Sequence, residues 1–481
     1  MECGVVIALL AALGAAALLP LALLAGAVLI VRPWDARPRS FAVVSTAPYP
    51  LFWATCALLE GCSRLAALKP APFRLAELAS GFVQSQVLFA LNDLGVPLAL
   101  AAGARTAPQI AASCCPGADP EWLERLLKAA ATLGLVRRVP AAAPRRRRGG
   151  AGAAAGAPAG ATEGAVPGAG LTGDAFEPTA LTAALVEGHP ACMAHFVGLF
   201  AQHYDAMGYL SEGVRRRVAP FRLTPESGGK PFFEHLAECE PDAQLFDSAM
   251  REVDHISGGS IFRAFNWGRF DHVVDVAGGN GQFLARLLAA HPRLRGTLFD
   301  QPQQVARGKQ WWELAHGDVL PRAAFAAGDM FDAATIPGPG GPRGGGRSAY
   351  VLRNILHDWD DASCLRILRA IRESACGAAG GSGKRGGKRG AAAAAPAAAP
   401  PPALLIVEAT LSGAAALPWT LRHRHASDVT MMAVFGGSKE RNESQFDALL
   451  AAAGWRLERA AATTGLYCVL EAVPAAAAAA R

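Results

Sequence analysis

The ten cysteines of this 481-residue chain include no C-x-x-C pair and no group at the spacing of a zinc site. This absence excludes the common zinc fingers and ribbons, and it indicates free thiols in a reducing compartment rather than a disulfide framework. Most of the cysteines stand singly among apolar residues, and only Cys114 and Cys115 are adjacent. Because no metal-binding cluster is evident, we expect no metal cofactor.

Charged residues are also scarce, at 18% of the chain, and the formal net charge is +6. Eight basic residues lie in two segments rich in Gly and Ala, at 145–148 and 384–389. These eight charges exceed the whole net charge, so the rest of the chain is close to neutral or slightly acidic. A protein that binds nucleic acid needs a basic surface, and we therefore expect no nucleic-acid partner.

The N-terminal segment has no charged residue from Gly4 to Val31. As a helix, this segment would extend about 42 Å, which exceeds the ~30 Å hydrocarbon core of a bilayer. A cleaved signal peptide is the alternative, but no basic residue precedes the apolar run, and the run is long for a signal peptide. Arg32, Arg37 and Arg39 follow it, so the positive-inside rule predicts a membrane anchor with the remaining chain facing the cytosol.

A glycine-rich turn follows a short apolar stretch in the middle of the chain. Residues 275–281 read Asp-Val-Ala-Gly-Gly-Asn-Gly, and the next seven residues have a helix-like pattern. Such a turn brings backbone N–H groups and a helix N-terminus close to a ligand. Leu284 stands where a dinucleotide fingerprint has its third glycine, which disfavours an NAD-dependent oxidoreductase. The acidic start and the glycine spacing resemble the first motif of S-adenosylmethionine-dependent methyltransferases.

Polar residues also end the strand-like segments that follow the glycine turn. Asp300 closes the next apolar segment, where the second strand of a Rossmann-type sheet presents a carboxylate to ribose hydroxyls. Asp329 and Met330 stand at the expected end of a third strand. A fourth strand leads into the sequence R-N-I-L-H-D-W, which begins at Arg353 and contains His357. The order of these residues predicts an α/β domain with a site at one edge of a parallel sheet.

This series of motifs resembles the plant-type and acetylserotonin-type small-molecule O-methyltransferases, over roughly residues 72–473. The resemblance implies a Rossmann-like class I methyltransferase domain preceded by an α-helical winged-helix domain that forms homodimers. It also implies S-adenosylmethionine as the cofactor and a small aromatic hydroxyl compound, a phenol or a hydroxyindole, as the substrate. The expected catalysis uses a histidine and carboxylates, and it needs no metal.

The resemblance also implies roles for individual residues. His357 would be the general base, assisted by Glu408 at the end of the next strand and by Glu440 in a G-G-S-K-E-R loop. The residues implied to bind the cofactor are Asp275, Gly278, Gly279, Gly281, Asp300, Asp329, Met330 and Arg353. Two residues depart from the family pattern. Ala277 replaces a common glycine, which affects binding only if its φ angle is positive, and the additional Ser438 would displace Glu440 slightly.

Helical spacing and composition predict the domain boundaries. Apolar residues recur at helical spacing up to Gly95, two further helices open at Ala107 and Pro120, and a β-like segment follows at 135–139. The predicted parts are an anchor and its flank (1–40), a linker or interfacial segment (41–71), a dimerisation domain (72–262), a methyltransferase domain (263–474) and a tail (475–481). The segments predicted to be disordered inserts, rich in Ala, Gly and Pro, are 141–170, 337–347 and 377–402.

A winged helix often binds DNA, but the third helix does not favour that function. Its basic residues Arg125 and Lys128 are balanced by Glu121 and Glu124, and its wide apolar face suits dimerisation. Two alternatives to a methyltransferase stay open. One is a methyltransferase-fold protein that performs another reaction beside the cofactor, and the other is a non-catalytic, membrane-tethered winged-helix adaptor.

Overall fold

The computed structural model describes residues 42–44, 69–140, 173–340, 346–377, 401–411, 421–465 and 467–476. They form two compact units, of which the smaller spans residues 72–202 and the larger contains the described residues from His203 onward together with 42–44 and 69–71. The sequence predicts the boundary at 262 instead. The long helix α11 (Glu240–Ala264) lies in the larger unit, where it packs against α12 (Gln282–Ala290).

The smaller unit consists of helices followed by a short wing. Its elements are α3 (Ala71–Asp93), α4 (Val96–Ala101), α5 (Ala107–Cys114), α6 (Pro120–Thr132), β2 (Val136–Val139), β3 (Ala175–Pro178), α7 (Ala180–Ala183) and the start of α8 (Ala194–Gly208). The core contains Leu91, Ile110 and Leu127, and each of these side chains is fully buried. β2 and β3 pair antiparallel as a wing, but four helices precede it where the sequence predicts three, because α4 is a separate short helix.

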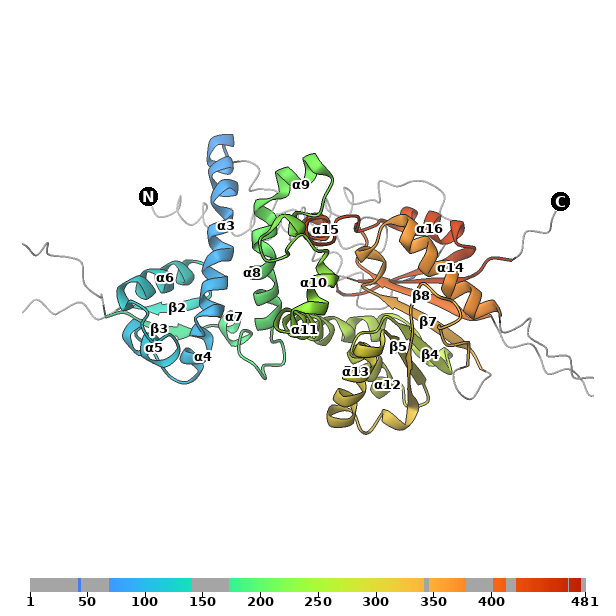
Figure 1. The fold of residues 1–481 in the computed structure, drawn as a ribbon. Coiled ribbons are helices and arrows are strands. Elements are labelled where there is room, and N and C mark those ends of the chain that lie inside the picture. Colours follow the sequence, from blue (N-terminus) through green and yellow to red (C-terminus); the bar gives the residue numbers. More distant parts are fainter. Residues whose placement is uncertain are drawn as a thin grey trace, which may run out of the picture. The chain divides into compact units, whose positions relative to one another are not determined.

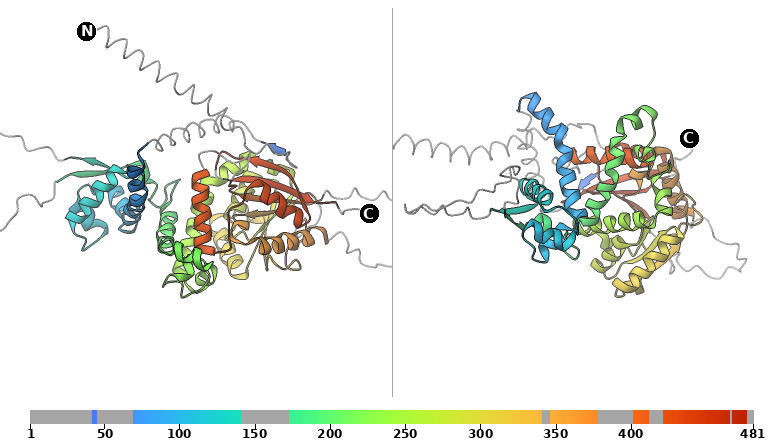
Figure 2. Two further views of the ribbon diagram at one scale, coloured as in Figure 1. Left: turned by 90° about the horizontal axis from the view of Figure 1, so that it is seen from above. Right: turned by 60° about the vertical axis from the view of Figure 1, so that its left-hand side comes forward.

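Helix α3 presents an exposed apolar face. Leu75, Leu78 and Phe82 are spaced as neighbours on one face of the helix, and more than half of each side chain's surface is exposed. Figure 2 shows that one end of α3 projects beyond the other helices of the smaller unit. Monomeric proteins rarely leave such a stripe uncovered, so this face is suited to contact a second protein chain.

The larger unit is built on an eight-stranded mixed sheet, with the order β1-β9-β10-β8-β7-β4-β5-β6 among the described residues. Its strands are β1 (Ala42–Val44), β4 (His272–Val276), β5 (Arg295–Asp300), β6 (Ala323–Ala327), β7 (Ser348–Arg353), β8 (Ala403–Glu408), β9 (Trp455–Ala462) and β10 (Cys468–Pro474). Strands β4 to β8 pair in parallel, whereas β10 is antiparallel to β8 and β9. The predicted Rossmann-like sheet is confirmed, and its parallel strands end at one common edge.

Helices cover both faces of this sheet (Figure 1). The flanking helices are α12 with α13 (Pro302–Ala315) on one face, and α14 (Asp361–Gly377) with α16 (Glu443–Ala452) on the other. Successive strand residues point to opposite faces, so Leu404 joins the core beneath α14 and α16 while Leu405 joins the core beneath α12. This arrangement buries β4 and β8 on both faces and fixes the ends of the strands in place.

A smaller group of helices in the larger unit packs through aromatic rings. It consists of α9 (Leu210–Arg216), a 3₁₀ turn (Pro220–Leu223), α10 (Phe232–Glu238) and α15 (Leu421–Phe435). The ring of Phe232 lies 5.2 Å from those of both Phe221 and Phe435, each in an edge-to-face arrangement. These contacts connect α10 to α15, the helix that precedes the loop of Glu440.

The N-terminal part of the chain is described only at β1. This strand pairs in parallel with Arg459–Ala461 of β9, so part of the predicted linker 41–71 extends the sheet. No described helix is long and apolar enough to cross a membrane. The predicted anchor, residues 4–31, lies outside the described residues.

The three predicted inserts fall at the ends of regular elements. The first insert, residues 141–170, lies between β2 and β3. Residues 141–170, 341–345 and 378–400 all lie outside the described residues. The start of the second insert is part of the folded unit, because the Tyr350 hydroxyl donates a hydrogen bond of 2.8 Å to the carbonyl of Pro337. The folded structure therefore continues further into the predicted 337–347 insert than its composition suggests.

Candidate active site

The glycine turn predicted to bind the cofactor connects β4 to α12. Gly279 and Gly281 have φ angles of +60° and +78°, and Gly281 is the N-cap residue of α12. A Cβ atom at Gly278 would lie 2.6 Å from Oδ2 of Asp275, so a side chain does not fit there. A Cβ at Gly279 would meet no atom within 4 Å, so the turn is open at this point. A ligand can therefore approach the backbone closely at the helix N-terminus.

Two carboxyl groups lie beside this turn, of which Asp275 is buried and Asp300 is partly buried. Oδ2 of Asp300, at the end of β5, accepts a 2.7 Å hydrogen bond from the N–H of Gly279. Burial raises the pKa of Asp300 to about 6, against the hydrogen bonds from Gln301 and Gly279 that lower it. Burial and the charge of Asp300 raise the pKa of Asp275 to about 7. Oδ2 of Asp275 has no hydrogen-bond partner among the described residues.

These features fit an S-adenosylmethionine site. The buried Asp275 oxygen lacks a partner, and a buried acceptor of this kind is stable only when a donor satisfies it. The turn at Gly279 has room for a ligand, and Asp300 stands at the end of β5, the strand position from which Rossmann-type sheets present an acid to ribose hydroxyls. The residues present therefore suit the cofactor that the sequence motifs imply.

Ala277 has a positive φ angle of 56°, so the departure from the family glycine places strain in the turn. A left-handed conformation costs an L-residue about 1–2 kcal/mol. We predict that Ala277→Gly raises the free energy of unfolding by about 0.5–1 kcal/mol, because removing the strain outweighs the added freedom of the unfolded chain. Urea unfolding measures this change.

The same substitution at an exposed helical site is the matched control. Ala448 lies within α16 and is exposed, so Ala448→Gly should lower the free energy of unfolding by roughly 0.5–1 kcal/mol. If Ala277→Gly also lowered stability by that amount, the inference of strain at Ala277 would be wrong.

The remaining predicted cofactor residues lie at the ends of β6 and β7. Asp329 follows β6, and its Oδ1 accepts a hydrogen bond of 2.9 Å from the N–H of Phe331, while the side chain of Met330 packs against the core. Arg353 ends β7, pairs with Asp254 of α11, and lies 5.2 Å above the ring of Phe283. The carboxylate of Asp254 therefore partly neutralises the positive charge of Arg353 within the protein.

His357 lies between two buried carboxylates. Its Nδ1 is 3.4 Å from Oε1 of Glu440 and 3.7 Å from Oε2 of Glu408. Glu408 is 0% exposed, and its Oε1 accepts hydrogen bonds from the N–H groups of Ile355 and Leu356 at 3.0 and 2.9 Å. The ligand atoms of His357, Glu408 and Glu440 lie within 4.8 Å of one another, close enough to hold a metal ion as well. The structure thus brings together the three residues predicted to act in catalysis.

The carboxylates around His357 favour its charged form. Burial lowers the pKa of His357, but the charges of Glu408 and Asp358, together with the hydrogen bond that Glu440 accepts from the imidazole, outweigh burial and raise this pKa to about 10. Burial raises the pKa of Glu408, and it raises that of Asp358 to about 7. The cluster therefore shares its protons, with the imidazole as the preferred place for one of them.

A buried arginine fixes the loop that carries His357. Arg441 donates hydrogen bonds of 2.6 Å to the carbonyl of Leu356 and 2.8 Å to that of Trp359, and it also pairs with Asp361. The N–H of Lys439 donates a further hydrogen bond of 3.0 Å to the carbonyl of His357. The loop of Glu440 and the loop of His357 are therefore held together by the Arg441 side chain, which binds backbone carbonyls, and by one hydrogen bond between the two backbones.

The additional residue Ser438 does not separate Glu440 from His357. Its hydroxyl donates a 2.7 Å hydrogen bond to the carbonyl of Met431 in α15. Glu440 is held independently, because its Oε1 accepts a 2.9 Å hydrogen bond from the hydroxyl of Ser427 and its N–H donates to Asp428. The sequence did not single out Ser427 or Asp428, although both lie on one helix twelve or so residues before Glu440.

Asp358 is a further member of the site that the sequence analysis did not assign. Its Oδ1 lies 3.4 Å from Nε2 of His357, on the side of the imidazole opposite the two glutamates. The residue directly follows the histidine in the L-H-D-W segment, and that adjacency is the signal that could have identified it. Both ring nitrogens of His357 therefore face a carboxylate.

The fold and the residues at the edge of the sheet define a Rossmann-like methyltransferase, and comparison of the chain with known proteins agrees with this. The chain matches the model of an O-methyltransferase domain over residues 207–382 and that of an O-methyltransferase dimerisation domain over residues 76–150. It is 32% identical to the 8-amino-8-demethylriboflavin N,N-dimethyltransferase of Streptomyces davaonensis over 292 residues, which are 60% of this chain and 70% of that protein.

Two further relatives cover more of the chain. The acetylserotonin O-methyltransferase of Mus musculus is 29% identical over 398 residues, with 82% of this chain and 86% of that protein aligned. The structure of human N-acetylserotonin methyltransferase in complex with S-adenosylmethionine has a TM-score of 0.63 at 23% identity, and it covers 85% of this chain and 99% of that chain. This last likeness concerns the fold.

This chain belongs to the O-methyltransferase family and uses S-adenosylmethionine. The match to the dimerisation domain also supports a homodimer. Membership of an enzyme family disfavours the alternative of a non-catalytic winged-helix adaptor.

Proposed function

We propose that this enzyme transfers the methyl group of S-adenosylmethionine to a hydroxyl group of a small aromatic compound, with His357 as the general base. The observation that carries this proposal is the imidazole of His357 held between Glu408 and Glu440, at distances of 3.7 and 3.4 Å. The cluster follows β7 and β8, and the glycine turn follows β4, which is the neighbour of β7 in the sheet.

The acceptor's proton explains why a base is needed. The cofactor supplies an electrophilic methyl group when bound. A phenol has a pKa of about 10, so little of it is ionised at neutral pH. Nε2 of His357 accepts the hydroxyl proton as the acceptor oxygen attacks, and such a step typically contributes ~10²–10⁴ in rate. Glu408 and Glu440 stabilise the imidazolium that forms and hold the ring in place.

The same residues favour a hydroxyl acceptor over an amine. The relatives include an enzyme named for N-methylation and another named for O-methylation. A neutral aromatic amine already has a free electron pair, and it needs no deprotonation before it attacks. A buried cluster of one histidine and three carboxylates is therefore better explained by an acceptor whose proton must be removed.

We assign the cofactor to residues at the edge of the sheet where the parallel strands end, next to the His357 cluster. Asp300 would bind the ribose hydroxyls, and residues 278–281 would bind the methionine end. Asp329 and Met330 would lie at the adenine. Arg353 would border the methionine end, because it lies over Phe283 at the start of α12. The supporting observations are the open turn at Gly279 and the unpartnered oxygen of Asp275.

A panel of matched acceptors tests the proposed function. Full-length protein and S-adenosylmethionine are incubated with phenols and hydroxyindoles, and with the corresponding anilines and aminoindoles. Mass spectrometry then identifies each product, and S-adenosylhomocysteine release gives the rate. We expect methyl ethers from hydroxyl acceptors. Exclusive N-methylation would refute a hydroxyl acceptor, and cofactor binding with no transfer to any acceptor would favour the alternative of a fold relative with other chemistry.

The raised pKa of His357 predicts an alkaline rise in activity. The base acts in its neutral form, and its pKa of about 10 means that the free enzyme is mostly protonated at neutral pH. The value of kcat/KM for a simple phenol should therefore rise nearly tenfold per pH unit above pH ~7. In Glu440→Gln the rise should shift to lower pH, because one of the charges that raises the pKa is gone. A profile that is flat from pH 7 to 9 in the wild type would contradict this account.

The exposed face of α3 predicts how the homodimer forms. Replacing Leu78 and Phe82 together with Asp should weaken the dimer at least 100-fold, since each side chain contributes about 1.5–3 kcal/mol when buried and each new carboxylate opposes burial. Leu314→Asp is the matched control, because Leu314 is 89% exposed on α13 of the other unit. Light scattering should find a monomer only for the double variant. A dimer that persists in the double variant would exclude this face.

The N-terminal apolar run supports a second, separate proposal. We infer that residues 4–31 anchor the enzyme in a membrane, with the methyltransferase domain in the cytosol, because the run is uncharged and arginines follow it. Fractionation of the full-length protein tests this. Recovery in the membrane fraction supports the anchor, and recovery of uncleaved protein in the soluble fraction refutes it.

A further inference from the structure

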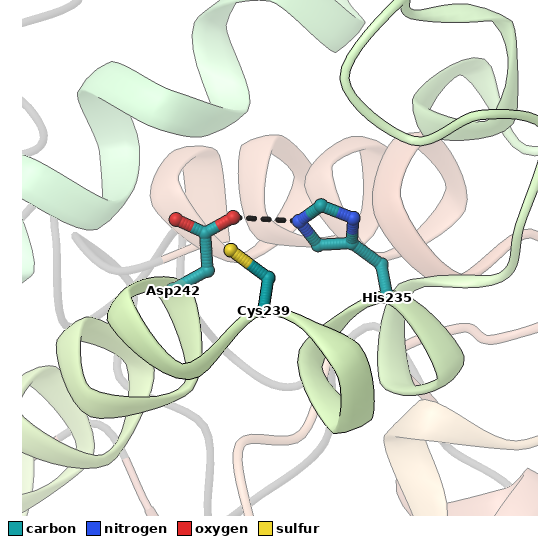
Figure 3. A group of neighbouring side chains, drawn as sticks. All are labelled: His235, Cys239 and Asp242. Atoms are coloured by element: carbon teal, nitrogen blue, oxygen red, sulfur yellow. Dashed lines mark hydrogen bonds and ion pairs between the residues drawn. The ribbon is translucent and has the colours of Figure 1, made fainter.

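Three side chains of metal-binding type converge where α10 meets α11 (Figure 3). They are His235, Cys239 and Asp242, and one ligand atom from each lies within 4.8 Å of the other two. Nε2 of His235 lies 2.6 Å from Oδ2 of Asp242. The three side chains point into one space beside the helix junction in Figure 3, so their ligand atoms share a common centre.

The backbone at the junction sets this convergence. His235 and Cys239 are four positions apart, and Cys239 and Asp242 are three positions apart. In an unbroken helix this spacing would place the three side chains on one face, and here they converge although the helix is interrupted at Cys239. Cys239 is the single residue between the two helices and has extended φ and ψ angles of −114° and 92°. Its N–H donates a 2.9 Å hydrogen bond to the carbonyl of His235, and its own carbonyl accepts one of 3.0 Å from Ala243. Both turns that carry the ligands are therefore fixed.

We propose that this cluster binds a divalent transition metal, of which Zn²⁺ fits the donor set best. Imidazole nitrogen, thiolate sulfur and carboxylate oxygen are the ligands that Zn²⁺ uses in proteins, and water fills the fourth position when the chain provides three. Bonds of about 2.0–2.3 Å in a tetrahedron place ligand atoms about 3.3–3.6 Å apart. Nε2 of His235 and Oδ2 of Asp242, at 2.6 Å, lie closer together than this, so these two side chains move apart by about 1 Å when the ion enters. The Cys239 sulfur already lies within 4.8 Å of both atoms.

Binding exchanges protons for the metal. Neutral His235 binds through Nε2 with its one proton on Nδ1, Asp242 binds as the carboxylate, and the thiol of Cys239 releases its proton to solvent as the metal–sulfur bond forms. The site is accessible to a cation, since the side chains of His235 and Asp242 are 13% and 23% exposed. Among the described residues, the carboxylate of Asp242 forms an ion pair with His235. The nearby Lys230 pairs with Glu238 instead.

The position of the site gives it a structural role. The ring of His235 packs edge-to-face against Phe221 at 5.5 Å, which orients the imidazole. A bound metal would connect α10 to α11, and α10 in turn packs through Phe232 on Phe435 of α15. Helix α15 carries Ser427, which holds Glu440. The metal would therefore stiffen the support of the catalytic loop without touching the reacting groups.

Cobalt(II) is the probe that tests the proposal. The metal-free, full-length protein is titrated with Co²⁺, and the near-ultraviolet charge-transfer band between thiolate and Co²⁺ is recorded. We expect one equivalent to produce the band, Zn²⁺ to abolish it by displacement, and Zn²⁺ to raise the melting temperature. The His357 cluster contains no thiol, so an ion bound there produces no such band.

Variants identify the ligands. Cys239→Ser should lose the band, and Asp242→Asn should weaken Co²⁺ binding at least tenfold, while circular dichroism confirms that both are folded. Cys376→Ser and Cys115→Ser are the matched controls, and both should keep the band. Absence of the band in the wild type would overturn the proposal. So would a band that persists in Cys239→Ser, or one that is lost in Cys115→Ser, since the latter would assign the metal to the adjacent cysteines.

Discussion

His357→Ala should lower kcat for an aromatic hydroxyl acceptor by ~10²–10⁴-fold, because it removes the proposed general base for the acceptor's proton. The affinity for S-adenosylmethionine should change less than about twofold, since His357 contacts the carboxylates Glu408 and Glu440 rather than the glycine turn. Steady-state kinetics with the best acceptor of the panel, together with calorimetry of cofactor binding, separate these two effects.

The control for this variant is a histidine away from the site. His291 is the C-cap residue of α12, at the end of that helix opposite the glycine turn, so His291→Ala should keep near-normal turnover. His357→Gln adds a second test, because glutamine can form hydrogen bonds but cannot accept a proton at neutral pH. If either variant at position 357 retained most of the activity at pH 7, the general-base role would be wrong.

Asp300→Ala should weaken the binding of S-adenosylmethionine by one or two orders of magnitude. Each hydrogen bond to a charged group contributes about 1.5–3 kcal/mol, and a factor of ten corresponds to about 1.4 kcal/mol. The variant also leaves the N–H of Gly279 without its acceptor at 2.7 Å, which loosens the turn. Isothermal titration calorimetry measures the dissociation constant directly.

An exposed aspartate in the same unit provides the comparison for Asp300. Asp318 lies in the exposed loop after α13, and Asp318→Ala should leave the dissociation constant unchanged. Asp300→Asn, which keeps an acceptor oxygen, should bind the cofactor with intermediate affinity. Equal affinities for the wild type and Asp300→Ala would remove Asp300 from the cofactor site.

The sequence was informative wherever function depends on the end of a strand. Asp300, His357 and Glu408 are far apart in the chain, yet each follows a strand of a parallel sheet, and such strands end at one edge. Strand order therefore converts spacing along the sequence into proximity in space. The motif series predicted the Rossmann-like sheet for this reason. The grouping of His357 with Glu408 and Glu440 was instead implied by the family resemblance, because Glu440 lies in the loop after α15 and follows no strand.

Other features depend on tertiary contacts that carry no local signal. The carboxylate of Asp358 faces Nε2 of His357 only because Arg441 fixes the loop between β7 and α14. The pairing of β1 with β9 joins segments from opposite ends of the chain. A short apolar stretch in the sequence does not indicate which distant strand it will pair with. The cluster around Cys239 mixes three ligand types, so a search for paired cysteines passes over it.

Single-turnover transfer is the most direct test of the central claim, which is that the His357 cluster deprotonates an acceptor hydroxyl for methyl transfer. The preformed complex of enzyme with methyl-labelled S-adenosylmethionine is mixed with a phenolic acceptor and quenched at intervals, for the wild type and for His357→Gln. We predict stoichiometric labelled methyl ether from the wild type, at a rate that increases with pH, and at least 100-fold slower transfer by the variant. Equal rates of ether formation by the two proteins, or no labelled ether from the wild type, would contradict the account.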